Sequence, residues 1–148
     1  MIISLGLDHR AAHLRDLIIG HLEELEFEVL DRGAADSTPI DYPDVAKKVA
    51  KDIKTMQANF GVLGCLTGIG MSIAANKFQG IRAALVHSEE DARLAREHND
   101  ANIMCIAGNS ITPELLKKAL DIFFMTEFEG GRHERRLSKI VEFEFSQK

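Results

Sequence analysis

A cysteine stands among glycines in the segment Gly64–Ser72, which reads GCLTGIGMS. The apolar residues before it predict a buried strand, and Gly68 and Gly70 predict a turn that opens a helix. Backbone N–H groups at such a turn converge on one point, which favours a phosphate or a reaction oxyanion. Cys65 would lie beside that point, where the amides favour the reactive thiolate. From composition alone, a small core cysteine beside a structural turn is the more common arrangement.

The loop matches none of three better-known phosphate-binding patterns. A P-loop would need Gly-Lys-Ser/Thr after the turn, which is missing here. A cysteine phosphatase would need Arg six residues beyond Cys65, where Met71 stands. A dinucleotide fingerprint would need its glycines after the first strand, which instead ends Gly6–Arg10, so Asp31 is only a weak signal for a ribose.

Three further polar groups could take part in chemistry. Asp8 and His9 end the first predicted strand and could hold sugar hydroxyls or move protons, although a simple turn is equally plausible. The segment His98–Asn102 precedes the last predicted strand and would also suit a helix C-cap. Arg132 and Arg136 share a helix face and could grip one phosphate, although a solvated basic face is more common. The histidines lack ligand-type spacing, so we expect no metal.

The elements that must position these groups follow from periodicity. Short apolar runs predict strands over residues 2–7, 27–30, 60–65, 81–86 and 103–107, with helical patterns between them. Ser88 with Asp91, and Thr112 followed by a proline, mark two helix starts. The alternation predicts an α/β fold: a Rossmann-like three-layer αβα sandwich around a five-stranded parallel sheet. A C-terminal helix would follow, with Leu137, Ile140 and Val141 on one face.

Length and charge limit the possible functions. The 148 residues suit a single domain, 1–148, and ligands of such sheets bind beyond the carboxyl ends of the strands. The formal net charge of −5 disfavours nucleic acid and anionic membranes as partners. Two cysteines make no disulfide framework, and the first residues lack the basic region of a signal peptide. We therefore expect a cytoplasmic protein that does not enter a membrane.

Together these motifs resemble the type B ribose-5-phosphate isomerase family, which includes allose-6-phosphate and galactose-6-phosphate isomerases. The resemblance extends over nearly the whole chain, and its motifs occur in the family's order. They are Gly6-Leu7-Asp8-His9, Asp41-Tyr42-Pro43, Cys65-Leu66-Thr67-Gly68-Ile69-Gly70, Ser72-Ile73-Ala74-Ala75-Asn76-Lys77, His98-Asn99-Asp100-Ala101-Asn102 and Glu129-Gly130-Gly131-Arg132-His133.

The resemblance implies an aldose–ketose isomerase acting on ribose 5-phosphate and ribulose 5-phosphate through an enediolate, without a cofactor. Cys65 would be the base, Thr67 would help move a proton between O1 and O2, and His98 would open the sugar ring with support from Asp8. The remaining roles would be as follows: Tyr42 and Asn99 hold hydroxyls; His9, Arg132 and Arg136 bind the phosphate; and the backbone N–H groups around Gly68, Ile69, Gly70, Met71 and Ser72 stabilise the enediolate.

The resemblance also implies a homodimer, or a homotetramer of dimers, with each site between subunits and the His-Asn segment supplied by the neighbour. Two residues depart from the family pattern. Leu66 replaces a usual Gly and could crowd the substrate or a turn that needs φ > 0, and Asn109 replaces a phosphate-binding Arg. Three alternatives stay open: a six-carbon aldose phosphate such as allose 6-phosphate as substrate, a non-catalytic sugar-phosphate-binding subunit, and a nucleotide-binding Rossmann domain.

Overall fold

The computed structural model describes residues 1–146 and contains a parallel sheet in the order β2-β1-β3-β5-β4. The predicted α/β class, with five parallel strands and a C-terminal helix, is confirmed. The strands are β1 (Ile2–Leu7), β2 (Glu28–Asp31), β3 (Phe60–Cys65), β4 (Ala83–Leu85) and β5 (Ile103–Ala107). The helices are the 3₁₀ turn η1 (Ala12–Leu14), α1 (Arg15–Glu24), α2 (Tyr42–Lys54), α3 (Ile69–Ala75), α4 (Glu89–Glu97), α5 (Pro113–Met125) and α6 (Arg132–Ser146).

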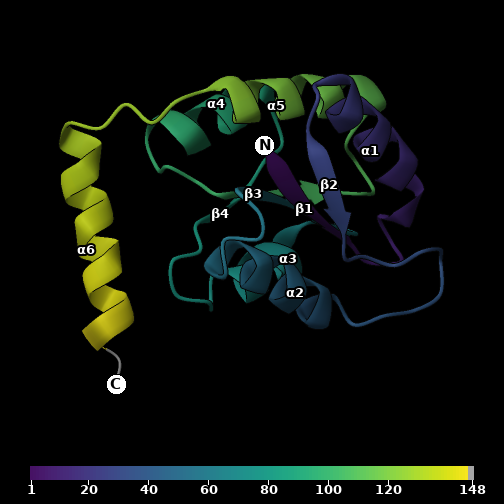
Figure 1. Cartoon of the computed structure of the whole chain (residues 1–148), viewed down its shortest axis with the longest axis horizontal. Helices are drawn as coiled ribbons and strands as arrows, with labels where there is room; N and C mark the ends of the chain where they lie inside the picture. The colour runs from purple at the N-terminus through teal and green to yellow at the C-terminus, as the bar shows by residue number, and fades with distance from the viewer. Residues whose placement is uncertain (147–148) are drawn as a thin grey trace.

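Both faces of the sheet are covered, which explains why its central strands are apolar without interruption. Helices α1, α4 and α5 lie on one face, and α2 and α3 lie on the other (Figure 1). Successive side chains of β3 alternate between the two resulting cores: Val62 packs with the first set of helices and Leu63 with the second. Cys65 and Cys105 both belong to the core beneath α2 and α3.

The predicted helix starts are confirmed. The Ser88 hydroxyl accepts a hydrogen bond from the Asp91 amide at 3.0 Å, and the Thr112 hydroxyl accepts one from the Leu115 amide at 3.2 Å. Two strands begin later than expected because turns use the backbone before them. The amide of Phe27 donates to Leu22 at the end of α1, and the amide of Ile81 donates to Phe78.

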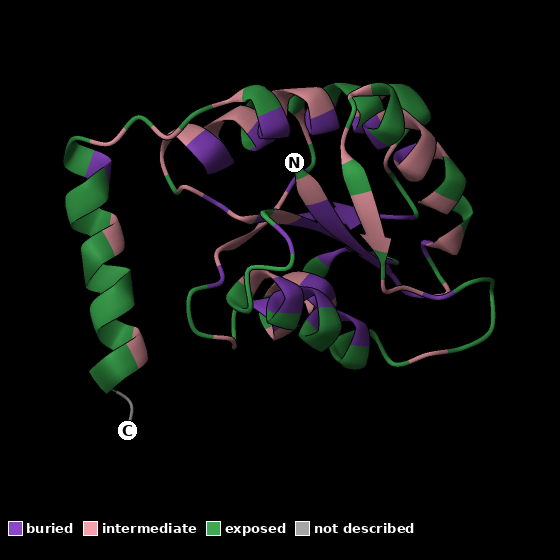
Figure 2. Ribbon diagram, in the orientation of Figure 1, coloured by how far each residue is buried: buried purple, intermediate pink, exposed green. Residues whose placement is uncertain are grey.

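Helix α6 stands apart from the rest of the molecule (Figure 1), and most of its surface is exposed (Figure 2). The side chains of Ile140, Phe143 and Phe145 are 45%, 60% and 57% exposed. A cavity of about 650 Å³ lies against this helix, lined on one side by Leu137, Ile140 and Phe143. The amide of Gly80 reaches across to the Glu144 carboxylate at 2.9 Å. An apolar helix face of this kind lacks the cover that a globular core gives.

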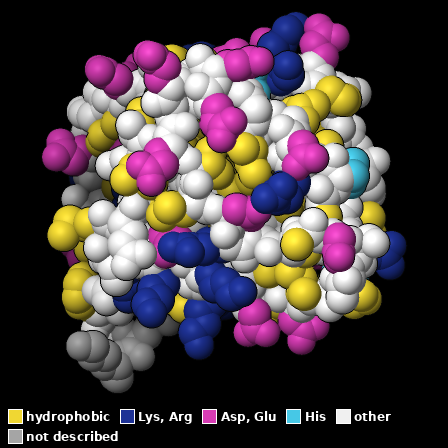
Figure 3. All heavy atoms as spheres, turned by 45° about the vertical axis from the view of Figure 1, so that its right-hand side comes forward, with side chains coloured by type: hydrophobic (Ala, Val, Ile, Leu, Met, Phe, Trp, Pro, Cys, Tyr) yellow, Lys and Arg dark blue, Asp and Glu magenta, His cyan; other side chains and the backbone are white. Residues whose placement is uncertain are grey.

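Within residues 1–146, no helix combines the length and apolar character needed to cross a bilayer. The face turned forward in Figure 3 carries basic, acidic and apolar side chains together. Lys and Arg side chains gather in its lower half. Lys48 and Lys51, two exposed lysines of α2, line one pocket together with Arg32. Acidic side chains border them, so the charge on this face is mixed.

Candidate active site

Cys65 is the last residue of β3, and its thiol faces the start of α3. The amide of Gly68 donates a hydrogen bond to Cys65 Sγ at 3.2 Å, and the side chain is 5% exposed. An N–H that points at sulfur stabilises the thiolate relative to the thiol. The second cysteine differs, because complete burial, together with the nearby Cys65, raises the pKa of the Cys105 thiol. Of the two cysteines, therefore, only Cys65 lies at the end of its strand and accepts a hydrogen bond from a backbone amide.

The turn after Cys65 leaves two amides without an acceptor among the described residues. Gly68 caps α3 with φ of +73°, the left-handed conformation that glycine adopts without strain. The amide of Ile69 donates to the Thr67 hydroxyl at 3.3 Å, and the amide of Ser72 donates back to Gly68. The amides of Gly70 and Met71 are the unpaired donors of this first helical turn. Of the five amides expected around an enediolate, these two are the ones with no acceptor among the described residues.

Leu66 and Asn109, the two departures from the family pattern, lie next to each other. The amide of Asn109 donates to the Leu66 carbonyl at 3.1 Å, and the amide of Gly108 donates to the Cys65 carbonyl at 2.8 Å. Leu66 is absent from the positive-φ residues of the chain, so its side chain strains no turn. Its side chain is 42% exposed beside the thiol, which makes crowding of the substrate the remaining consequence.

Asp8, His9 and Tyr42 lie around the same loop. The amide of Asp8 donates to the Gly64 carbonyl at 2.9 Å, and the carboxylate of Asp8 accepts from the Arg10 amide at 2.8 Å. His9 Nδ1 accepts from the Ile40 amide at 3.3 Å, so a neutral ring carries its proton on Nε2. Tyr42 begins α2, and a Cβ added to Gly70 would lie 2.7 Å from its Cζ atom. Three strand and helix ends therefore bring these predicted residues together.

The other predicted residues lie at the opposite edge of the sheet. His98 is the C-cap of α4, and the Asn99–Asn102 segment leads into the start of β5. Ile103 pairs with Gly61 at the start of β3, whereas Ala107 pairs with Cys65 at its end. Those four residue steps along β5 span about 13 Å at about 3.3 Å per residue. A single chain therefore does not bring His98 to Cys65.

A partly buried network of two arginines fixes the loop that carries His98. Asp100 has φ of +43°, and its carboxylate accepts from Arg96 at 2.8 Å and from Arg82 at 2.9 Å. Arg96 is 7% exposed and also donates to the Ala101 carbonyl at 2.6 Å. Asp tolerates the left-handed region better than most residues, and here two cations hold it there. The predicted phosphate ligands Arg132 and Arg136 lie on α6, where both residues are exposed.

Two residues near His98 received no role from the sequence. Glu129 and His133 lie beside it, and the three side chains place possible metal-ligand atoms within 4.8 Å of one another. The i,i+4 spacing of Glu129 and His133 at the start of α6 was the available signal. It was not informative without knowing that α6 begins beside the end of α4.

The chain is similar to proteins of known activity over almost its whole length. Residues 3–140 match the profile described as Ribose/Galactose Isomerase. It is 44% identical over 146 residues to the probable ribose-5-phosphate isomerase B of Mycoplasma pneumoniae, covering 96% of this chain and 94% of that protein.

Solved structures give the same result. The ribose-5-phosphate isomerase B of Clostridium thermocellum is 40% identical and superposes with a TM-score of 0.98 over 100% of both chains. The Mycoplasma genitalium enzyme, solved with bound ribulose-5-phosphate, is 40% identical with a TM-score of 0.93, covering 99% of this chain and 97% of that one. With this sequence match, this fold and this set of strand-end residues, the chain belongs to the ribose/galactose isomerase family.

Proposed function

We propose that this chain interconverts ribose 5-phosphate and ribulose 5-phosphate, with Cys65 as the base that moves a proton between C2 and C1. The observation that carries the proposal is the thiol at the end of β3, bonded to one amide and followed by two unpaired ones. The substrate pair is supported by the relatives named ribose-5-phosphate isomerase B and by the bound ribulose-5-phosphate in one of them.

The residue types match what the reaction needs. A sugar C2–H is a weak acid, so its removal requires a positioned base and stabilisation of the enediolate oxygen. The Cys65 thiolate takes the proton from C2 and returns it at C1. The amides of Gly70 and Met71 stabilise the enediolate, and the Thr67 hydroxyl moves a proton between O1 and O2. Tyr42 holds a sugar hydroxyl from above the loop, where its ring packs against Gly70.

The remaining groups come from a second copy of the chain. His98, which opens the ring with support from Asp8, and Asn99, which holds hydroxyls, lie at the far edge of the sheet from Cys65. Arg132 and Arg136, which bind the phosphate together with His9, lie on the exposed helix α6. A homodimer that seats this edge of one copy on the Cys65 loop of the other completes two equivalent sites. A homotetramer would be a pair of such dimers.

The uncovered surface of α6 supports this assembly. Its exposed apolar side chains, which include Ile140, Phe143 and Phe145, gain cover when a second copy packs there. The cavity of about 650 Å³ against α6 is also lined by Asn99 but not by the Cys65 loop. Apolar and sugar-binding surfaces thus meet at one place on the chain. Both cysteines are free thiols, which suits a single-domain protein of a reducing cytosol.

Turnover of ribose 5-phosphate by purified, reduced protein tests the function, with Cys65→Ala as the matched variant. We expect isomerisation to fall by at least about 10²-fold, the lower limit for losing a general base, while substrate still protects the variant from heat. Near-normal kcat in the variant would contradict the role of the thiol. Binding without any turnover by the unmodified protein would favour a non-catalytic sugar-phosphate-binding subunit, and turnover only of a six-carbon aldose phosphate would reassign the substrate.

Mixing two inactive variants tests the shared site. Cys65→Ala and His98→Ala each spoil every site in their own dimers, but a hybrid dimer has one site with both residues intact. Random exchange of subunits should restore about one quarter of the wild-type activity, because half of the dimers are hybrids with one good site of two. No recovery after verified subunit exchange would contradict a site formed between copies.

A further inference from the structure

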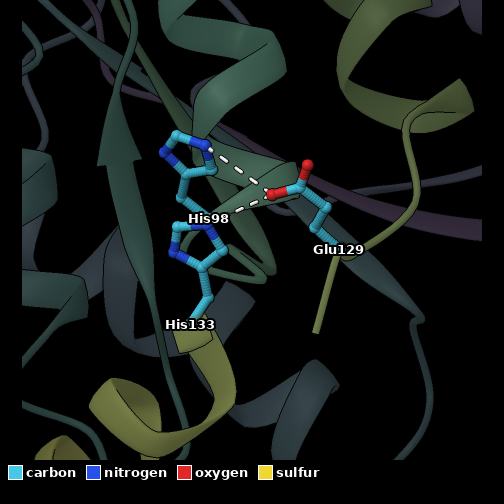
Figure 4. Close-up of side chains that lie close together, drawn as sticks. All are labelled: His98, Glu129 and His133. Carbon is cyan, nitrogen blue, oxygen red and sulfur yellow. Dashed lines mark ion pairs between the residues drawn. The ribbon is translucent and has the colours of Figure 1, made fainter. Parts of the chain in front are cut away.

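A compact cluster of side chains forms where α4 ends and α6 begins (Figure 4). The rings of His98 and His133 are stacked, with centroids 4.1 Å apart and planes inclined by 14°. Glu129 Oε2 lies 3.1 Å from His133 Nε2 and 3.9 Å from His98 Nε2. One carboxylate therefore faces the same nitrogen of both rings.

Exposure separates the two histidines. The side chain of His98 is 35% exposed, so it has an edge that a substrate can reach. The side chain of His133 is 5% exposed, and its buried Nε2 has the Glu129 carboxylate as an ion-pair partner at 3.1 Å, although the two groups do not meet in hydrogen-bond geometry. His133 cannot touch a substrate, so any role it has must pass through His98.

The stacked rings fit a shared metal ion poorly, although three possible ligand atoms lie within 4.8 Å of one another. An imidazole nitrogen binds a metal through a lone pair in the plane of its ring. Rings inclined by only 14° and stacked face to face keep those lone pairs in two nearly parallel planes. They cannot converge on one ion unless a ring turns. The arrangement instead suits one imidazole that holds another in place.

We propose that Glu129 and His133 are positioning residues for His98 in opening the sugar ring, an inference that rests on the proposed function. The stack with His133 fixes the plane of the His98 ring. The carboxylate favours a proton on the Nε2 side and leaves Nδ1 of His98 to act on the substrate. The proton of O1 passes to Nδ1, the C1–O4 bond breaks as the C1=O1 carbonyl forms, and the imidazole returns the proton to O4.

The two directions of the reaction separate ring opening from proton transfer. Ribose 5-phosphate is mainly a closed ring and must be opened, whereas ribulose 5-phosphate stays open because its O5 is esterified. Exchange of the C1 hydrogen of ribulose 5-phosphate with solvent deuterium therefore needs Cys65 but not ring opening. It reports on the proton-transfer half of the site alone.

Glu129→Gln and His133→Phe test the proposal, because the first removes only the charge and the second keeps a flat ring for stacking. We expect both to lower kcat/KM for ribose 5-phosphate by about 10–100-fold, part of the 10²–10⁴-fold from general acid–base catalysis, and to change deuterium exchange by less than about threefold. Glu127→Gln, an exposed acid two residues before Glu129, is the matched control and should change neither rate.

Each other outcome has a separate meaning. Equal loss of both rates, or loss of neither, overturns the positioning role, with thermal unfolding used to check that Glu129→Gln is folded. Loss of wild-type activity on chelation, restored by Zn²⁺, also overturns it and favours a metal at these side chains. Absence of both turnover and exchange in the wild-type protein would contradict the proposed function instead.

Discussion

Replacing Gly68 by alanine should destabilise the protein in two ways: through the left-handed backbone at this position and through a clash of the new Cβ with β5. Gly68 has φ of +73°, and an added Cβ would lie 2.8 Å and 2.9 Å from the carbonyl oxygen and carbon of Ile106, and 2.5 Å from Leu85 Cδ1. The leucine can rotate, but the Ile106 carbonyl belongs to β5 and cannot move alone. Gly80 offers a matched control, because its φ is +79° and an added Cβ would contact nothing within 4 Å.

The magnitudes follow from these contacts. Left-handed backbone costs a residue with a Cβ about 1–2 kcal/mol, and this cost applies to both variants. The clash with β5 adds about 1–3 kcal/mol to Gly68→Ala alone. The lower entropy of the unfolded chain in a Gly→Ala variant is shared and cancels in the comparison. We expect Gly68→Ala to be less stable than Gly80→Ala by about 1–3 kcal/mol.

Urea unfolding followed by circular dichroism, at one protein concentration, gives the difference in unfolding free energy. Activity is the second readout, because relief of the clash shifts the amide that bonds to Cys65 Sγ and the two unpaired amides after it. Loss of one oxyanion donor costs about 10²–10³-fold in kcat. Equal stability of Gly68→Ala and Gly80→Ala, with full activity in both, would refute the reasoning.

Two further predictions concern an ion pair in the core and the second thiol. Burial alone would raise the pKa of Asp52, but hydrogen bonds from Arg32 and Ser4 outweigh it and hold the pKa below its ordinary value of 3.8. Asp52→Asn should therefore lower the unfolding free energy above about pH 4 by about 1–3 kcal/mol, toward the low end because Arg32 is partly exposed. This difference should shrink as the pH falls below the ordinary pKa of the carboxyl and through its lowered one, so unfolding curves should show a smaller difference at pH 3 than at pH 7. Alkylation should modify Cys65 and spare Cys105, whose burial raises its pKa, so mass spectrometry should find one adduct per native chain and none in Cys65→Ala.

Periodicity and caps were enough to predict the fold, because they are local properties of the chain. The apolar runs over residues 2–7, 60–65 and 103–107 match the observed strands, since strands buried on both faces are apolar throughout. Edge strands were predicted less well. β4 pairs only with β5, and the turn at Ile81 takes up residues whose apolar character suggested a longer strand.

The candidate site was predictable only in part, because its contacts are between distant segments. The Cys65 loop could be recognised as a strand, a turn and a helix start, which are neighbours in sequence. The packing of Tyr42 on Gly70 and the bond from Asn109 to Leu66 depend on which strands are adjacent. The stack of His98 on His133 depends on where α6 begins, which is 35 residues after α4 ends at Glu97, with β5 and α5 in between.

The topology itself explains why one chain does not bring His98 to Cys65. In a parallel sheet every strand ends at the same edge, and every connecting helix returns the chain to the other edge. A residue at the end of α4 is therefore a strand's length from Cys65 whatever its side chain is. Substitution cannot close that gap, whereas the proposed dimer would bring the starting edge of one sheet to the finishing edge of another. The polar network around Asp100 suits the proposed dimer, because residues offered to a second copy must be held in place by their own chain.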